Sequence, residues 1–124
     1  MKSIYSADQW GGKTYPLITG SYYTGSGYDL NGHSYSIASG QDVTIYVNGN
    51  FNLMSGSKIT LNGGKLTVYS TGDITFNQGS ILGNINSNLQ IFSAGVVNLS
   101  SGSFINGGNV ILSASKSIAF NGGS

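Results

Sequence analysis

A four-fold internal repeat constrains the fold of this chain more than any other feature. Four seven-residue segments carry apolar residues at alternate positions, and each is followed by a second, shorter apolar segment. The four segments begin at Val43, Leu66, Leu89 and Val110, with offsets of 23, 23 and 21 residues. Self-similarity at a period of this length indicates a solenoid, in which each repeat buries its apolar side against its neighbours.

Within each segment the apolar and polar residues alternate, which is the pattern of a half-buried strand. Gly, Asn-Gly and Gly-Ser pairs separate the segments and suit sharp corners. The connections are too short for a crossover helix, so successive turns stack at about the 4.8 Å spacing of neighbouring strands. The sequence therefore predicts an all-β, right-handed parallel β-helix (a β-solenoid) with three short strands per turn and about four regular turns.

Stacking places equivalent residues in ladders, and two ladders are predicted to line the core. The first contains Ile45, Val68, Ile91 and Leu112, and the second contains Leu53, Phe76, Leu99 and Phe120. A third segment of each turn is less regular. Its apolar pairs are Ile59 and Leu61, Ile81 and Ile85, and Phe104 and Ile105.

The repeat also divides the chain. Residues 1–16 show no periodicity and are predicted to be an N-terminal arm or linker. Residues 17–42 are rich in Tyr and Gly and are predicted to form an irregular turn that caps the coil, while residues 43–124 form the regular turns. No closure follows the last turn. We expect that end to continue in a longer solenoid or to be covered by another subunit, which would build a filament head to tail.

Composition limits the function classes. Charged residues are 7% of the chain, with no Glu and no Arg, and the net charge of +1 leaves no electrostatic footprint for nucleic acid. The absence of Cys excludes disulfides and thiolate metal sites. No run reaches the roughly 18 apolar residues of a membrane span. Solubility that rests on hydroxyl and amide groups is typical of an extracellular or cell-surface protein.

Enzymes that cleave polysaccharides are commonly built on β-helices, and they need paired carboxylates or a carboxylate cluster that holds calcium. The repeat places Asn50 and Val96 at the positions equivalent to Asp73, so no second carboxylate is expected beside it. His33 is the lone histidine, and a capping or surface role is favoured over a triad with Asp29 and a neighbouring serine. We therefore expect no catalytic residue, no metal and no cofactor.

Two groups of aromatic residues are candidates for binding. Tyr46, Tyr69 and Phe92 are predicted to form an outward ladder that contacts glycans or a partner, although mutual stabilisation of stacked strands is the favoured interpretation. Aromatic residues outside the regular turns suggest either a packed cap or an interface. The candidate interface residues are Trp10, Tyr22, Tyr23, Tyr28 and, at the other end, Phe120.

Short motifs also carry a family resemblance. In the first turns these are Tyr22-Tyr23, Asn31-Gly32, Val43-Thr-Ile-Tyr-Val-Asn-Gly-Asn50 and Ser55-Gly-Ser57. Together they resemble the β-helical domain of bacterial pilus-assembly-associated surface proteins, which follows a hydrophobic N-terminal membrane helix absent from these residues. The later stretches Gly107-Gly-Asn-Val-Ile-Leu-Ser-Ala-Ser115 and Ser117-Ile-Ala-Phe-Asn-Gly-Gly123 resemble repeats of filamentous-haemagglutinin-like adhesins. The resemblance spans about residues 17–124 and implies an extracellular adhesive or structural role without catalytic residues.

The sequence thus predicts a non-catalytic extracellular β-solenoid of a bacterial surface protein, with a structural or adhesive role. One alternative is a filament subunit that stacks head to tail through its open end. A second is a carbohydrate-binding module. The expected partners are further copies of the chain, other domains of a longer surface protein, or glycans.

Overall fold

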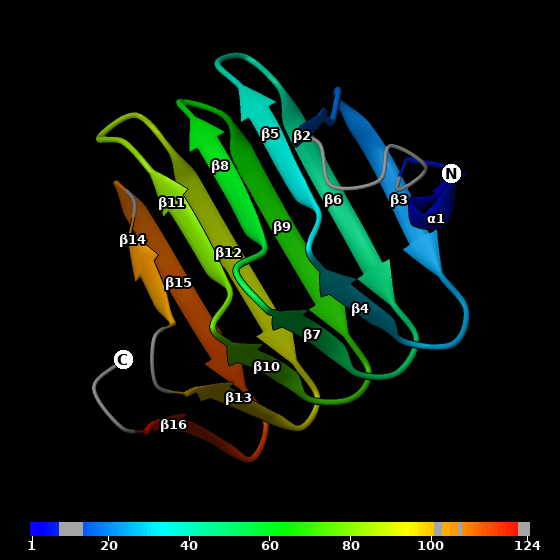
Figure 1. Ribbon diagram of the computed structural model, residues 1–124, viewed down its shortest axis with the longest axis vertical. Helices are drawn as coiled ribbons and strands as arrows, with labels where there is room; N and C mark the ends of the chain where they lie inside the picture. The colour runs from blue at the N-terminus through cyan, green and yellow to red at the C-terminus, as the bar shows by residue number, and fades with distance from the viewer. Residues whose placement is uncertain (8–13, 101–102, 107, 122–124) are drawn as a thin grey trace.

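The computed structural model describes residues 1–7, 14–100, 103–106 and 108–121. These residues form a stack of parallel strands wound into a coil of about five turns, as the repeat predicted. In Figure 1 the chain runs down one sheet at the back, crosses the bottom and returns upward at the front, while the coil advances from right to left. A viewer at the N-terminal end sees this path turn clockwise as it recedes, so the coil is right-handed.

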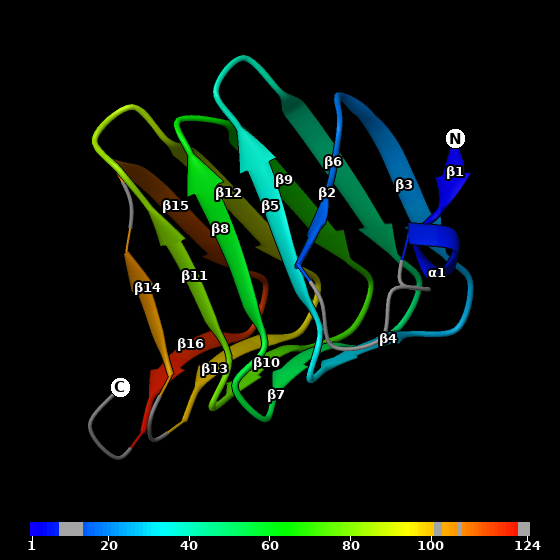
Figure 2. The ribbon, with the colours of Figure 1, turned by 45° about the horizontal axis from the view of Figure 1, so that its top comes forward.

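Three parallel sheets make up the walls of the coil, and Figure 2 shows them from a tilted view. Sheet A contains β1 (Lys2–Ser3), β3 (Gly20–Thr24), β6 (Asp42–Val47), β9 (Lys65–Ser70), β12 (Asn88–Ser93) and β15 (Asn109–Ala114). Sheet B contains β2 (Thr14–Pro16), β5 (Ser34–Ala38), β8 (Lys58–Asn62), β11 (Ser80–Gly83) and β14 (Phe104–Asn106). Sheet C contains β4 (Tyr28–Asn31), β7 (Phe51–Met54), β10 (Ile74–Asn77), β13 (Val96–Leu99) and β16 (Ser117–Phe120).

The strand register confirms the predicted alignment of the repeats. In sheet A, Leu66 pairs with Val43 on one side and Leu89 on the other, and Leu89 pairs in turn with Val110. The alignment holds because a slip of one residue would move every apolar side chain of a strand from the core to solvent. The matching register of sheet C pairs Phe51, Ile74, Val97 and Ile118 in order.

The predicted alignment of the third segment is right only in part. Ile59 pairs with Ile81, but Ile81 pairs with Ile105 and not with Phe104, which pairs with Ser80. Leu61 pairs with Gly83 and not with Ile85. Strand β11 ends at Gly83, so Ile85 lies in the following turn and is exposed. The error arose because an apolar residue two positions beyond the strand end mimics the alternation of the strand.

The turn formed by residues 17–42 is more regular than predicted. Strands β3, β4 and β5 occupy all three sheets, and their register with the next turn is continuous: Gly20 pairs with Val43, Tyr28 with Phe51 and Tyr35 with Ile59. The apolar positions here are occupied largely by tyrosines. Because a tyrosine carries a hydroxyl, the alternation is harder to recognise than in the aliphatic turns.

Residues 1–7 and 14–16 form part of the stack, which corrects the prediction of an arm or linker for residues 1–16 as far as the structure describes them; residues 8–13 lie outside the described residues. Strand β1 pairs with β3, and β2 pairs with β5. The short helix α1 (Ile4–Ala7) places Ile4 in the core, and the hydroxyl of Tyr5 donates a hydrogen bond of 2.8 Å to the carbonyl of Gly27. Strands of two and three residues are too short to show periodicity, so the sequence did not reveal them.

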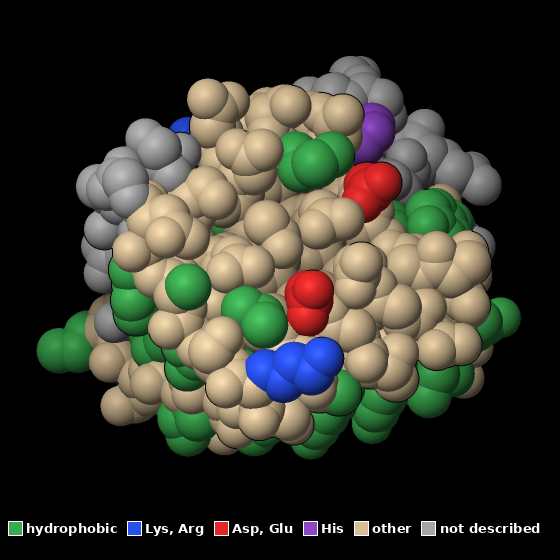
Figure 3. Space-filling view, turned by 90° about the horizontal axis from the view of Figure 1, so that it is seen from below, with side chains coloured by type: hydrophobic (Ala, Val, Ile, Leu, Met, Phe, Trp, Pro, Cys, Tyr) green, Lys and Arg blue, Asp and Glu red, His purple; other side chains and the backbone are tan. Residues whose placement is uncertain are grey.

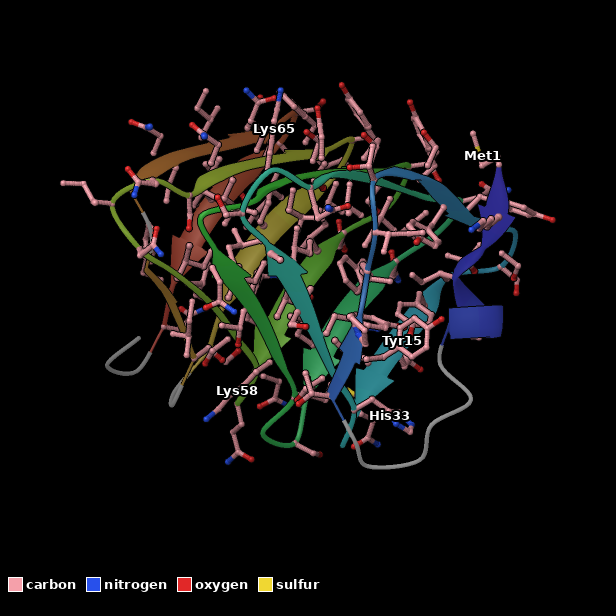
Figure 4. The ribbon with its side chains drawn as sticks, turned by 90° about the horizontal axis from the view of Figure 1, so that it is seen from above. Met1, Tyr15, His33, Lys58 and Lys65 are labelled. Atoms are coloured by element: carbon pink, nitrogen blue, oxygen red, sulfur yellow. The ribbon has the colours of Figure 1, made fainter. Side chains whose placement is uncertain are left out.

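The core is a continuous column between the three sheets. Aliphatic ladders fill most of it, and rings fill the N-terminal end, where the hydroxyls of Tyr28 and Tyr35 bond to each other. The ring of Tyr15 packs edge-on against Tyr35, at a centroid distance of 6.5 Å. Figure 4 shows Tyr15 within this cluster, while Lys58 points away from the coil. The N-terminal turn is thus closed by aromatic packing.

Candidate functional site

Three aromatic side chains stack in a row on the outer face of sheet A, and we call this row the aromatic ladder: Tyr46, Tyr69 and Phe92. Strand pairing places Tyr46 beside Tyr69 and Tyr69 beside Phe92. The ring centroids lie 5.3 and 5.1 Å apart, with interplanar angles of 10° and 13°. The structure therefore brings together the three residues that the sequence predicted.

The stacking decides what the aromatic ladder can bind. A sugar that packs on an aromatic residue places its C–H groups against a free ring face. Both faces of Tyr69 are covered by its neighbours, so its ring presents an edge and a hydroxyl to solvent. This arrangement favours stabilisation of the parallel strands over stacking on a glycan.

A shallow groove of about 480 Å³ runs beside the aromatic ladder, where sheet A turns into sheet C. Rings form one side of the groove, and corner residues of successive turns form the other. Its lining consists of Met1, Tyr23, Thr24, Gly25, Tyr46, Val47, Asn48, Tyr69, Ser70, Thr71 and Ala94. Sequence analysis placed Tyr23 in the cap and missed this groove. The offset of 23 residues between Tyr23 and Tyr46 is the signal that would have revealed it.

The candidate interface residues separate into different environments. Tyr22 and Tyr28 lie inside the core, so they stabilise the first turn, and the interface predicted for them is corrected. Both side chains point inward because strand pairing places Tyr22 beside Ile45 and Tyr28 beside Phe51, which are buried one turn later. Tyr23 and Phe120 are exposed, and Trp10 lies outside the described residues.

Asp73 sits at the corner between sheets A and C and has a structural partner. Its Oδ1 accepts a hydrogen bond of 2.8 Å from the backbone N–H of Val96, one turn later. Asn50, one turn earlier, does the same for the N–H of Asp73 at 2.9 Å. Because an amide oxygen serves equally well at this corner, the carboxylate of Asp73 is explained by backbone capping.

Charged side chains are scattered over the described surface. Figure 3 shows few charged side chains on this face, where a basic group lies next to an acidic one among neutral polar and hydrophobic side chains. Asp29 accepts a hydrogen bond of 2.7 Å from the side-chain amide of Asn52, its neighbour on the next strand of sheet C. Within the described residues, no group of three or more His, Cys, Asp or Glu side chains is placed to hold a metal ion.

Comparison with known proteins identifies the family of this chain. Residues 3–119 match the model of the family described as "Domain of unknown function (DUF7305)". The chain belongs to this family. The match covers nearly the whole DUF7305 chain, from β1 into β16, so the family model spans all three sheets. No curated protein and no solved structure matches it.

The described part of this DUF7305 chain contains no helix long and apolar enough to span a membrane.

Proposed function

We propose that this DUF7305 chain is a non-catalytic structural and adhesive β-solenoid of an extracellular bacterial surface protein. The observation that carries the proposal is the division of the coil into an apolar interior and an outer face made mainly of neutral polar rows and aromatic edges. Such a surface offers many weak, uncharged contacts along one axis. A rigid adhesive or spacer module needs this property.

The backbone supports a mechanical role. Between the ends of the stack, each strand bonds to the equivalent strand on both sides, so bonds between turns run along the whole coil. The corners add side-chain bonds between turns, including those of Asn50 and Asp73. Repeat architectures of this kind distribute stability over nearest-neighbour contacts along the whole coil.

The two alternatives have less support. A carbohydrate-binding module would hold sugars against free ring faces, but both faces of Tyr69, the middle ring of the aromatic ladder, are covered by its neighbours. A head-to-tail filament would need an open edge at each end of the coil. The described N-terminal end is instead covered by β1, α1 and β2.

Adhesion and catalysis are separated by one experiment with the purified chain. Beads coated with the chain are tested for retention under flow on glass, polystyrene and polysaccharide films, and the same films are assayed for released reducing ends. We expect retention above that of albumin-coated beads, and no release. The matched variant is Asp73→Asn, which keeps an oxygen for the N–H of Val96 but removes the acid. It should retain beads equally well. Release of reducing ends that Asp73→Asn abolishes would establish an enzyme and overturn the proposal.

The extracellular location is tested separately. Antibodies against the purified chain should label intact cells of the source organism as strongly as permeabilised cells. Labelling that requires permeabilisation would place the chain inside the cell and contradict this part of the proposal.

A further inference from the structure

The groove beside the aromatic ladder has the size of a small-molecule site. Its volume of about 480 Å³ lies within the range of about 300–1,000 Å³ that is usual for ligand pockets. Tyr23, Tyr46 and Tyr69 line it from three neighbouring strands, so this side of the groove is about 10 Å long at the spacing of parallel strands. The three side chains are 45%, 40% and 42% exposed. Their surface is therefore open to a ligand.

The polar side chains at the rim of the groove already bond to one another. Oγ1 of Thr71 accepts a hydrogen bond of 2.8 Å from the N–H of Gly49 and donates one of 3.2 Å to Oδ1 of Asn48. Asn48 in turn donates through Nδ2 to the carbonyl of Gly25, at 3.4 Å. These groups hold successive corners of the coil together.

The two polar side chains at the floor of the groove are buried and also bonded. Oγ1 of Thr24 donates to the carbonyl of Gly27 at 2.6 Å, and Oγ of Ser70 donates to the carbonyl of Gly49 at 2.6 Å. No charged side chain is among the lining residues. Apart from the tyrosine hydroxyls, the groove thus has few groups to replace the water that a sugar or an ion would lose on entering it. An uncharged, weakly polar ligand suits this lining.

The rings of Tyr46 and Tyr69 turn their edges toward the groove. These rings stack with an interplanar angle of 10°, so their faces are directed along the coil axis and their edges sideways. The edge of an aromatic ring carries partial positive charge and its face partial negative charge, so an edge attracts the face of another ring. A flat aromatic molecule that lies along the groove can present its face to both edges at once.

We propose that the groove binds an uncharged, elongated aromatic molecule, which lies along the coil axis with its ring face against the edges of Tyr46 and Tyr69. The electrostatic fit between ring edges and a ring face selects an aromatic molecule over a saturated one of the same size. The bonded corner residues select against a sugar. This site goes beyond the proposed adhesive role, which requires no ligand in the groove.

Two ligands with the same carbon skeleton test this chemistry. 2-Naphthol is flat and aromatic, whereas decahydro-2-naphthol is its saturated counterpart. In a titration of the unmodified chain, 2-naphthol should shift the amide resonances of Gly25, Asn48 and Thr71, with a dissociation constant on the order of 0.1–1 mM. Decahydro-2-naphthol should bind at least about threefold more weakly. Methyl cellobioside should shift none of these resonances over the same concentrations.

Matched variants locate the site. A Cβ on Gly25 would meet no atom within 4 Å, so Gly25→Leu adds a side chain to the lining without a clash. It should weaken the binding of 2-naphthol by at least about tenfold. The control Ala38→Leu adds a side chain of the same size at an exposed position of β5, outside the groove, and should bind like the unmodified chain. If Gly25→Leu fails to fold, Ala94→Leu fills the same groove from another exposed position.

Four results would overturn the proposal. Equal binding of the two naphthols would show an apolar crevice without preference for aromatic rings. Tighter binding of methyl cellobioside would make the groove a glycan site. The absence of a saturable shift, or binding that persists in both Gly25→Leu and Ala94→Leu, would show that the groove is not the site. Retention of coated beads under flow is measured without these ligands, so failure of the groove site leaves the adhesive proposal to its own test.

Discussion

Two serines of the coil are equally buried but differ in what their hydroxyls contact. Ser57 and Ser87 are each 1% exposed. The Oγ of Ser87 donates to the carbonyl of Leu61 at 2.6 Å and accepts from the N–H groups of Gly63 and Asn84. The Oγ of Ser57 has no hydrogen-bond partner within the described part of the chain. A buried hydroxyl stabilises a fold only when its hydrogen bonds are made.

This pair leads to a prediction for stability. Ser87→Ala leaves a buried carbonyl and two N–H groups without their partner, so it should lower the free energy of unfolding by about 1–3 kcal/mol. Ser57→Ala removes a hydroxyl that bonds to nothing, so it should leave stability unchanged or raise it by up to about 1 kcal/mol. Urea unfolding followed by circular dichroism measures both changes. Equal losses in the two variants would show that the hydroxyl of Ser57 is bonded in solution.

Corner glycines are explained by the same side-chain caps. A Cβ on Gly72 would overlap Oδ1 of Asn50, and a Cβ on Gly95 would overlap Oδ1 of Asp73. The Asn or Asp at each of these corners therefore needs a glycine one turn later. Asn50 with Gly72, and Asp73 with Gly95, are therefore two copies of the same corner structure.

At the scale of the element, the aromatic ladder acts through cross-strand contacts. Tyr69 on β9 contacts a ring on each side, while Tyr23, in the same row on β3, has no ring contact with another described residue. Both tyrosines are about equally exposed. They therefore separate the effect of stacking from the effect of an exposed tyrosine.

We expect Tyr69→Ser to lower the free energy of unfolding by about 1–2 kcal/mol, because it removes two stacked pairs. Tyr23→Ser should change it by less than about 0.5 kcal/mol. Thermal and urea unfolding provide the measurement, with retention on polysaccharide films measured in parallel. If Tyr69→Ser keeps full stability but loses retention, the aromatic ladder is a binding site and not a structural one.

At the scale of the whole molecule, the two ends of the coil differ. The first turn is covered by α1 and by the short strands β1 and β2, whereas β14, β15 and β16 form the last described layer. In a solenoid each turn is stabilised mainly by its neighbours. A change at one end is therefore expected to loosen that end before it affects the middle.

Ile4→Ala tests this expectation, because Ile4 is fully buried beneath the N-terminal cover. This substitution should lower the free energy of unfolding by about 2–5 kcal/mol. Amide exchange should accelerate in β3 and β4 far more than in β12. The matched control is Ile18→Ala, since Ile18 is near in sequence but 56% exposed. Uniform acceleration through β12 would mean that the coil opens as a single unit.

The sequence by itself determined the architecture from Val43 onward. The 23-residue offset identified the three-strand turn, and the alternation within each segment set the register of Val43, Leu66 and Leu89. The physical reason is that a turn buries its apolar residues only when equivalent residues of successive turns lie side by side. The spacing of apolar residues in the sequence therefore determines the register. The aromatic ladder followed from the same register.

Only the tertiary structure decided which N-terminal residues belong to the coil and what the candidate residues contact. Tyr22 and Tyr28 can serve equally well in a core or on a surface, and their burial depends on the cover supplied by Ile4 and Tyr5. That cover rests on strands of two and three residues, whose pairing comes from contact with distant strands and not from local pattern. The bond from Val96 to Asp73 likewise exists only because the coil places residues 23 positions apart side by side.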